Sequence, residues 1–494
     1  MITASDPWLL LLVVVPLLAA PVCVLLRSPS GAWSVATAVS WAVFGISIKL
    51  LLTVLEHGQA VYRIGGWDAP WGIEYVLDPL GAFVVLIVAG IGAVTMPYAK
   101  RSVEKEIRKD RIYLFYTMLL LCLSGLLGIT VTGDAFNLFV FLEISSLSTY
   151  VLISMGQDRR ALTAAFRYLI MGTIGATFYI IGVGLMYQVT GTLNFADLKT
   201  IMPAVIETRT ILAALAFLTV GISLKLALFP LHMWLPNAYT FAPSVVTAFL
   251  AATATKVSVY VLLRIIFTVF GDVDIFASFP LQPVLIAMAL AAMFLASLSA
   301  IWQENVKRML AYSSIAQIGY IVLGIALATE AGLSGGIVHM FNHALMKGTA
   351  FFAIGAVIYA TGAVTLKDLE GIGKRMPVTM AAFVIAGLGL IGVPLTPGFI
   401  SKWQLVTAAL ELDMWPLAAL ILLSSLLAVI YVWRVFEVAY LREPAITADK
   451  PADVPLSMLV PIWTLAGAAI YFGANGTFTL DLADTAARHL MGGF

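Results

Sequence analysis

The chain has 494 residues, of which 61% are hydrophobic and 11% are charged. Soluble domains contain about 45–50% apolar and about 25% charged residues, so these values exclude a soluble protein. The 28 basic and 27 acidic residues leave a net charge of +1, which excludes the basic field that nucleic-acid binding needs. Apolar runs long enough to cross a bilayer recur along the chain and predict an all-α polytopic membrane protein.

The first apolar run, residues 8–26, follows Asp6 and no basic residue, and it contains no clear small-residue cleavage site. Secretory signal peptides begin with a basic segment, so we expect a first helix that is retained. Cys23 and Cys122 lie inside apolar runs without a second ligand nearby. We expect these thiols to face lipid or the core, with no disulfide framework and no metal site.

Hydropathy and helix breakers together predict about fourteen membrane spans. We place them at residues 8–26, 31–55, 76–98, 112–131, 135–155, 161–189, 208–239, 243–269, 281–301, 309–328, 332–361, 378–410, 415–440 and 455–473. Most basic residues then fall in loops on one side of the membrane, whereas Arg63, Lys199, Arg209 and Arg488 lie on the other. Because basic loops face the cytoplasm, both termini are predicted on the outer side.

The sequence pattern of residues 190–198 returns 171 residues later. Its shared residues are Thr190, Gly191, Asp197 and Leu198 in the first copy and Thr361, Gly362, Asp368 and Leu369 in the second. In the same order along the chain, ISSLSTY (144–150) resembles YSSIAQIGY (312–320) with a two-residue slip. These matches predict an internal repeat.

Each half of the predicted repeat also contains a broken span, at Pro230 in the first half and at Pro394 and Pro397 in the second. Two units of five spans would be inverted relative to each other, because an odd number of crossings starts the second unit on the opposite side. Inverted repeats with broken helices are typical of transporters. We therefore divide the chain into helices 1–3 (1–110), a first inverted repeat of helices 4–8 (111–270), a second inverted repeat of helices 9–13 (271–440), and helix 14 with a tail (441–494).

Glu143 is the one acidic residue predicted well inside the membrane. An ionisable residue at that depth costs about 2.5–3.5 kcal/mol, so it needs a partner, water or a function. Lys225 precedes Pro230 by about one helical turn, and the proline should open the helix and free carbonyl groups for water. We predict that Glu143 and Lys225 form a switchable ion pair, because a nearby carboxylate keeps a lysine charged and its departure favours release of the proton.

Lys256 lies in the middle of its span, which contains no carboxylate. His339, His343 and Lys347 follow one another at i, i+4 and i+8 and therefore project from one helix face. That face could carry a proton wire, since histidine exchanges protons near neutral pH.

Lys402 follows Pro394 and Pro397, just past the second broken helix. Structural ion pairing is the alternative explanation for these buried charges. The shortage of acids counts against it, because the single carboxylate of Glu143 cannot neutralise four buried lysines.

Three other ionisable residues have simpler interpretations. Lys49, near the outer end of its span, would snorkel or pair with Glu56. Arg264, also near an outer end, would be an interface anchor, and His232, beside the first break, would be a capping or packing residue. We find no phosphate-binding Gly-rich loop, no Cys pattern for iron–sulfur or zinc and no nucleophile elbow, so we expect a transporter subunit without a cofactor and not an enzyme.

Six motifs together resemble the antiporter-like subunits shared by Mrp-type Na⁺/H⁺ antiporters, respiratory complex I and membrane-bound hydrogenases. They are FLEISSLSTYVL around Glu143, LKLALFPLHMWLPNAY around Lys225, ATKVSVYVLLR around Lys256, VKRMLAYSSIAQIGY (306–320), HMFNHALMKGTAFF (339–352) and PLTPGFISKW around Lys402. The resemblance covers about residues 70–440. It implies fourteen helices, two inverted five-helix repeats and a hydrated polar axis near the membrane midplane.

The resemblance also implies roles for matching positions. Glu143 and Lys225 resemble the glutamate–lysine pair of the first half-channel. The remaining matches are Lys256 as the connecting lysine, His339, His343 and Lys347 as the central relay of the second repeat, and Lys402 as the broken-helix lysine of the exit half-channel. Implied partners are other membrane subunits of a hetero-oligomeric complex, protons, Na⁺ and lipid, in a bacterial cell (inner) membrane.

Within the family, the size of the chain and Lys402 resemble the D-type subunit of the Mrp-type antiporters, although LHMWLPNAYTFAPSVV (231–246) departs from the expected pattern. A smaller complex I paralogue is similar in size. Three functions therefore stay open. The chain would be a proton-translocating subunit of a cation/proton antiporter, the same module in a redox-driven or inorganic-carbon uptake complex, or a membrane scaffold with a vestigial polar axis.

Overall fold

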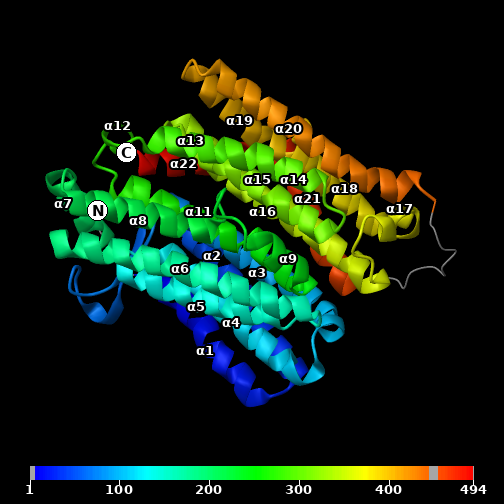
Figure 1. The fold of residues 1–494 in the computed structure, drawn as a ribbon. Helices are drawn as coiled ribbons and strands as arrows, with labels where there is room; N and C mark the ends of the chain where they lie inside the picture. The colour runs from blue at the N-terminus through cyan, green and yellow to red at the C-terminus, as the bar shows by residue number, and fades with distance from the viewer. Residues whose placement is uncertain (1–5, 444–453, 493–494) are drawn as a thin grey trace.

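The computed structural model describes residues 6–443 and 454–492, and these residues form a bundle of long helices (Figure 1). Within this described part, thirteen helices are long and apolar enough to cross a membrane. The number becomes fourteen when the pair Lys367–Arg375 and Pro377–Ile391, bent by 110°, counts as one span. The predicted all-α polytopic fold is confirmed.

The N-terminal part contains three helices and one hairpin. They are α1 (Trp8–Leu26), α2 (Pro29–His57), β1 (Ala60–Arg63), β2 (Glu74–Leu77) and α3 (Pro79–Glu106). The strands pair antiparallel, with Ala60 opposite Leu77. The backbone N–H of Asp6 donates to the carbonyl of Val61 at 3.1 Å, which ties the start of α1 to this hairpin.

The remaining helices form two similar series followed by a C-terminal pair. The first series is α4 (Ile112–Val131), α5 (Ala135–Ser154), α6 (Arg159–Thr190), α7 (Phe195–Val205), α8 (Arg209–Leu226), α9 (Leu235–Phe241), α10 (Ser244–Ala252) and α11 (Ala254–Arg264). The second is α12 (Ile275–Ser278), α13 (Leu281–Ala291), α14 (Ser297–Ile301), α15 (Val306–Ala326), α16 (Glu330–Thr361), α17 (Ile372–Arg375), α18 (Pro377–Ile391), α19 (Pro397–Glu411) and α20 (Trp415–Phe436). The C-terminal pair is α21 (Leu456–Ala474) and α22 (Thr477–Leu490).

The two series share their backbone contacts as well as their helices. Two hydrogen bonds join the loop before α5 to the loop after α6, and an equivalent two join the loop before α15 to the loop after α16. They run from Ala135 N to Leu193 O, from Phe195 N to Gly133 O, from Val306 N to Val364 O and from Leu366 N to Glu304 O. Every residue of the second set stands 171 positions after its counterpart, which is the spacing of the sequence repeat.

The two equivalent loop pairs lie at opposite ends of α3. The first lies at its N-terminal end, where the N–H of Gly133 donates to the carbonyl of Glu74 at 2.9 Å. The second lines a cavity together with Glu106, the last residue of α3. The two series are therefore inverted relative to each other. The exact domain bounds given above remain predictions.

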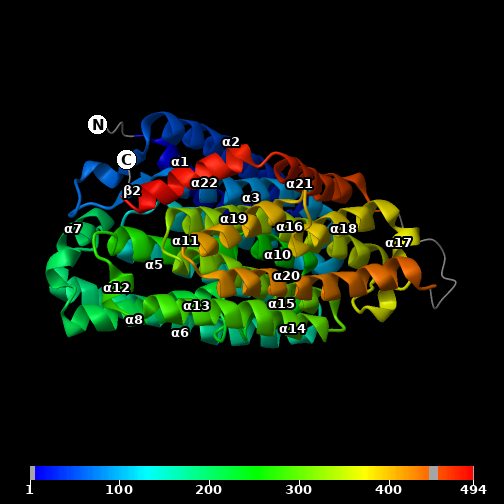
Figure 2. The ribbon, with the colours of Figure 1, turned by 90° about the horizontal axis from the view of Figure 1, so that it is seen from above.

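Helix α16 occupies the centre of the bundle (Figure 2). It packs against α3, α10, α15, α18, α19, α21 and α22. Every side chain of α16 from Gly332 to Val357 is buried, whereas α1, α2, α6 and α20 leave many large apolar side chains exposed on the outside. Buried polar groups on α16 are thus shielded from lipid, as polar residues at membrane depth require.

The predicted C-terminal tail contains a further helix, α22, which hydropathy alone did not identify. Its sequence, TFTLDLADTAARHL, is apolar on one face only, so it lacks the uniform apolar run that predicts a span. Asp484 accepts a hydrogen bond from Ser334 of α16, and His489 Nδ1 lies 3.3 Å from Asp78 Oδ2 at the start of α3. Both ends of the described chain therefore lie at the same end of the bundle.

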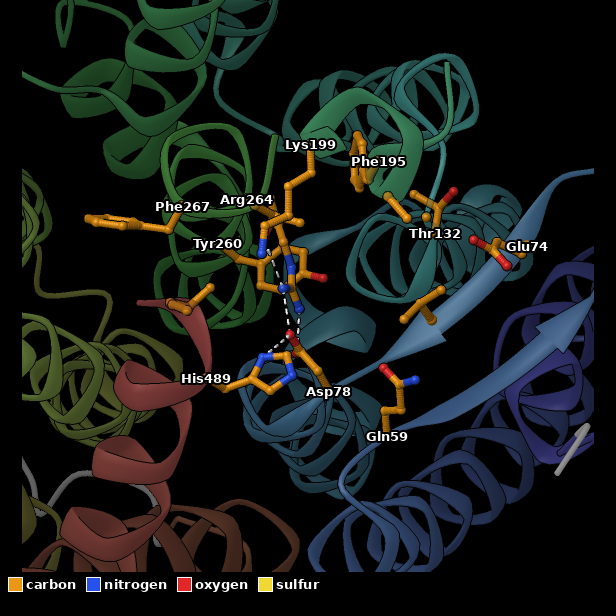
Figure 3. A pocket seen from close by; sticks show the side chains of 15 residues that line it. Gln59, Glu74, Asp78, Thr132, Phe195, Lys199, Tyr260, Arg264, Phe267 and His489 are labelled. Atoms are coloured by element: carbon orange, nitrogen blue, oxygen red, sulfur yellow. Dashed lines mark hydrogen bonds and ion pairs between the residues drawn. The ribbon is translucent and has the colours of Figure 1, made fainter. Parts of the chain in front are cut away.

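The interpretation of Arg264 as an interface anchor is wrong. Its side chain is 8% exposed, and its Nη1 donates to Asp78 Oδ2 at 2.6 Å while Nη2 contacts Oδ1 (Figure 3). Burial alone would raise the pKa of Asp78, but the adjacent Arg264 charge outweighs it and holds this pKa well below its ordinary value. The partner stands 186 positions away, so the span of Arg264 gave no sign of it.

The structure also places the other residues that the sequence analysis set apart from the main site. Lys49 stays at the surface, with Nζ 4.1 Å from the ring centroid of Trp8. His232 is buried and stacks on Phe229, with 5.0 Å between ring centroids. Cys23 and Cys122 are free thiols buried in the core.

The Asp78–Arg264 pair should be important for stability. Asp78→Asn keeps the side-chain acceptor that caps α3 but leaves the Arg264 charge buried and unpaired, which should cost about 3–5 kcal/mol. Because the folded-state pKa of Asp78 is lowered, this contribution is fully present above the ordinary carboxyl value of about 3.9 and is lost only as the pH falls below it. Thermal unfolding of the purified protein between about pH 5 and 8 should show a constant deficit for the variant.

The matched control is Asp68→Asn, which removes an ion pair of similar length at the surface. Arg63 Nη1 lies 2.6 Å from Asp68 Oδ1, with side chains 52% and 74% exposed. We expect a loss below about 1 kcal/mol there. Equal losses for the two variants would contradict the importance of burial.

Candidate functional site

Glu143 and Lys225 meet between α5 and α8. Lys225 Nζ lies 3.6 Å from Glu143 Oε1 and donates a hydrogen bond to Ser146 Oγ at 2.7 Å. The lysine side chain is 6% exposed, whereas that of the glutamate is 26% exposed. The predicted pair is thus assembled, with its carboxylate on the outer side of the lysine.

The first helix break lies directly after Lys225. Helix α8 ends at Leu226, and Ala227 adopts the left-handed conformation with φ 58°. Pro230 lies in the irregular segment before α9. A cation in the last turn of a helix interacts favourably with the negative end of the helix dipole, so Lys225 is held by both Glu143 and its own helix end.

The second helix break supplies the partners of Lys402. Helix α18 ends at Ile391, and Lys402 of α19 folds back so that Nζ donates to the carbonyls of Leu390 at 2.9 Å and Ile391 at 3.0 Å. Pro394 lies between the two helices and Pro397 begins α19. These carbonyls have no partner within their own helix, because a helix leaves its last four C=O groups unpaired.

A third break holds Lys256 and was not predicted. Residues 243–269 were predicted to form one span, and Ser244–Val269 does form one, but Thr253, with φ −124° and ψ −62°, interrupts its helix between α10 and α11. The fully buried Lys256 donates to the carbonyl of Ala251 in the last turn of α10. No proline marks this place, so the sequence pattern could not reveal it.

His339 and His343 lie in the buried centre on α16. Their rings are nearly parallel, with an interplanar angle of 8° and 6.3 Å between centroids. His339 is held on both sides, by Ser401 Oγ at 2.8 Å from Nδ1 and by Gln317 Oε1 at 2.9 Å from Nε2. Within the described residues, neither ring nitrogen of His343 has a hydrogen-bond partner, which leaves both positions available for proton exchange.

Lys347 completes the polar face of α16. Its Nζ donates to the carbonyl of Leu310 at 2.9 Å and to Ser313 Oγ, both on α15. The double-serine motif of each repeat therefore contacts a buried lysine, because Ser146 binds Lys225 in the first repeat.

Helix packing brings the groups of the two repeats together. Helix α10, whose Ala251 carbonyl binds Lys256, packs against α16, which carries both histidines and Lys347. Lys225 of α8 and Ser258 of α11 line one small cavity of about 10 Å³. The candidate site thus consists of buried polar side chains from both repeats.

Several polar residues of this path were missed by sequence reasoning. Ser146, Gln317 and Ser401 directly bind Lys225 or His339, and Tyr320 places its ring 4.6 Å from Lys402 Nζ. Each lies inside a motif that was already singled out. Their signal was a hydrogen-bonding side chain within an otherwise apolar span, which needs a partner at that depth.

The path is rich in nitrogen groups and poor in oxygen ligands for cations. Throughout residues 6–443 and 454–492, no three His, Cys, Asp or Glu side chains gather to hold a metal ion. Hard cations prefer several oxygen ligands. The arrangement therefore suits transfer of protons between side chains better than coordination of a cation.

Comparison with known proteins agrees with this geometry. Residues 132–428 match the family model described as NADH:quinone oxidoreductase/Mrp antiporter, TM. The chain belongs to this family. It is an antiporter-like membrane subunit.

The relatives are named as subunits of two kinds of complex, quinone oxidoreductases and Na(+)/H(+) antiporters. The chain is 42% identical to the N-type subunit of the NADH-quinone oxidoreductase of Desulforudis audaxviator, over 95% of this chain and 96% of that protein. It is 31% identical to the D-type subunit of the Na(+)/H(+) antiporter of Alkalihalophilus pseudofirmus, over 89% and 88%. It also superposes on a chain of the Mrp complex from Dietzia sp. with a TM-score of 0.89 and 26% identity, covering 98% of this chain and 97% of that one.

The two hydrogen bonds that hold His339, with Ser401 and Gln317, should influence the rate of transport. Gln317→Leu and Ser401→Ala each remove one hydrogen bond worth about 1 kcal/mol, so each should slow transport by the complete complex about fivefold. The measurement is the initial transport rate in membrane vesicles. Ser299→Ala removes a hydroxyl of α14 outside the site and should leave the rate unchanged. Wild-type rates in both Gln317→Leu and Ser401→Ala would contradict a role for these two hydrogen bonds.

Proposed function

We propose that this chain is the proton-translocating subunit of a multisubunit Na⁺/H⁺ antiporter. Protons would pass from Lys225 through Lys256 and the histidine face of α16 to Lys402. The observation that supports the proposal is the near absence of carboxylates around these lysines. Among residues 6–443 and 454–492, Glu143 alone forms an ion pair with one of them, at 3.6 Å from Lys225 Nζ.

The pair of Glu143 and Lys225 would act as the switch. While the carboxylate remains near, the Coulomb attraction keeps the ammonium group protonated. When Glu143 moves away, the buried lysine loses its counter-charge and releases its proton toward Lys256. The other lysines are bound by neutral carbonyl or hydroxyl groups, which accept hydrogen bonds from a charged lysine without fixing its charge.

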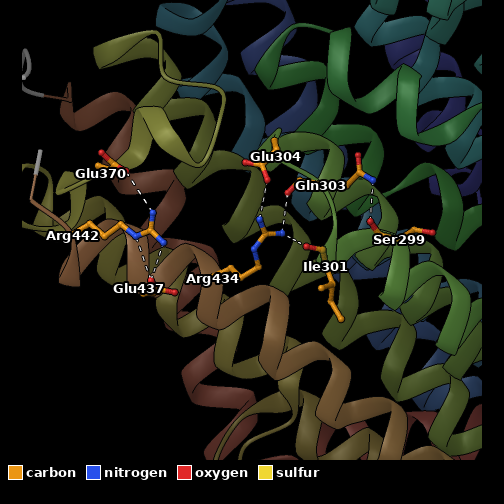
Figure 4. A network of polar contacts seen from close by, with 8 residues as sticks. All are labelled: Ser299, Ile301, Gln303, Glu304, Glu370, Arg434, Glu437 and Arg442. Carbon is orange, nitrogen blue, oxygen red and sulfur yellow. Dashed lines mark hydrogen bonds and ion pairs between the residues drawn. The ribbon is translucent and has the colours of Figure 1, made fainter. Parts of the chain in front are cut away.

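The proposal includes an orientation in the membrane, which the basic residues in the loops at one end of the bundle support. Arg434 Nη2 lies 3.1 Å from Glu304, and Arg442 contacts Glu437 at 3.1 Å and Glu370 at 3.7 Å (Figure 4). These charges belong to the loops assigned to the cytoplasm by their basic residues. We place this end in the cytoplasm and both termini outside, in a bacterial cell (inner) membrane.

Partner subunits would complete the transport of Na⁺. The partly exposed Glu143 is the one carboxylate of the described path, so a cation site with several oxygen ligands would form where a partner covers this surface. Other membrane subunits, as in the multisubunit Mrp complex, would supply these ligands.

Lys225→Ala tests the proposal directly. The variant should abolish cation-dependent proton exchange in everted vesicles, because it removes the charge that Glu143 would control, while the complex still assembles. Lys49→Ala, which removes an exposed lysine from a span, should retain wild-type exchange. Wild-type exchange in an assembled Lys225→Ala complex would disprove the role of Lys225.

A second function is favoured by the 42% identity to a quinone oxidoreductase subunit. In a redox-driven complex the same path would move protons in response to chemistry in a partner, and Na⁺ would have no effect. Purification of the native complex and identification of its subunits distinguishes the two. An antiporter should contain only membrane subunits and require Na⁺, whereas redox subunits and proton movement without Na⁺ would replace the first proposal by the second.

A further inference from the structure

A cavity of about 360 Å³ opens at the end of the bundle that carries Glu106. Its lining comes from the end of α3, the loop between α9 and α10, the start of α15 and the end of α16. Its rim includes Asp158 and Arg160, whose side chains are 39% and 70% exposed, so the cavity is open to solvent. We call it the Lys307 vestibule, after the buried lysine in its wall.

Glu106 fixes one wall of this vestibule. Its carboxylate accepts hydrogen bonds from Ser102 Oγ at 2.7 Å and from Ser244, through the backbone N–H at 2.8 Å and the hydroxyl at 3.0 Å. Ser244 is the first residue of α10, so Glu106 caps that helix from another helix. The loop before α10 is held in place.

Lys307 forms the inner wall. Its side chain is buried, and its Nζ donates to the carbonyl of Ala242 at 2.6 Å. Neither the proton path described above nor a lipid contact accounts for a buried lysine at this place. Burying an ammonium group is costly unless it has a function or a full set of partners.

Lys307 is one helical turn from the proton path. Leu310, whose carbonyl accepts from Lys347 Nζ at 2.9 Å, follows Lys307 by three positions on α15. Residues at i and i+3 lie on the same helix face, about 4.5 Å apart along the axis. Lys307, in the wall of the vestibule, is therefore one turn of α15 from the carbonyl that binds Lys347.

We propose that the Lys307 vestibule is the opening through which protons from the solvent at this end of the bundle reach Lys347, with Lys307 as the group that passes them inward. This proposal rests on the proton-translocating function proposed above. It adds a second access to the path, separate from the Glu143–Lys225 pair, and gives Lys307 a role in transport.

Blocking the vestibule tests the proposal. Ile358→Cys places a thiol on its wall, and both native cysteines are buried. The complete complex is placed in vesicles, and a membrane-impermeant trimethylammonium methanethiosulfonate is applied to the side on which the cavity opens. The reagent should modify this cysteine and slow proton transport about tenfold or more. Lys367→Cys, exposed at the same end but outside the cavity, should react without loss of transport, and Val364→Cys, a second wall position, repeats the test.

The outcomes separate this proposal from the function it rests on. Complete modification at both wall positions with unchanged transport, or no modification at either, would overturn the vestibule alone. Absence of proton transport before modification, in wild-type complexes, would overturn the proton-translocating function and the vestibule with it.

Lys307 itself has a separate test. Lys307→Met keeps most of the side-chain volume but removes the proton-carrying group, whereas Lys307→Arg keeps a donor for Ala242. If Lys307 passes protons, Lys307→Met should change how the transport rate depends on the pH at the side on which the cavity opens. The dependence of the rate on the pH at the opposite side should be unchanged. A merely structural role would lower the rate equally at all pH values, and Lys307→Arg would restore it.

Discussion

The interaction on which this structure depends is a lysine ammonium group bound by backbone carbonyls where a helix is interrupted. Lys402 binds the end of α18, and Lys256 binds the end of α10. In lipid, an interrupted helix exposes unpaired carbonyls and a buried lysine exposes unpaired donors. The lysine donates hydrogen bonds to the free carbonyls, so each break and its lysine stabilise one another. The resulting lysines have partners but no fixed counter-charge.

Sequence reasoning found the parts of this arrangement that leave local traces. Pro230, Pro394 and Pro397 mark two of the breaks because proline removes a donor and clashes within a helix. The break at Thr253 carries no such residue and was missed. The Asp78–Arg264 pair was missed for a different reason, since its members are far apart in the chain and neither span reveals the other. Local chemistry was thus predictable, whereas contacts between distant segments needed the fold.

The repeat explains why fold and site differ in how well they could be predicted. The backbone contacts return at a spacing of 171 residues, yet the charges do not, since the position 171 after Lys225 is Thr396. Likewise His339 corresponds to Tyr168, which stacks on Trp234 with 3.8 Å between ring centroids. The first repeat carries an ion pair, whereas the second carries two histidines and two lysines without a carboxylate partner among the described residues. The inverted fold therefore has unequal chemistry in its two halves.

The position of Glu143 decides how such a path can be driven. Every lysine and histidine of the path is at most 6% exposed, whereas the Glu143 side chain is 26% exposed at the outer surface of α5. Under the proposed function, a neighbouring subunit would reach this carboxylate, whereas it would not reach the buried interior groups. Either a cation or a redox reaction in the neighbour could supply that change without altering the path itself. Relatives named after two different complexes, at 42% and 31% identity, are what a shared proton module with exchangeable drivers predicts.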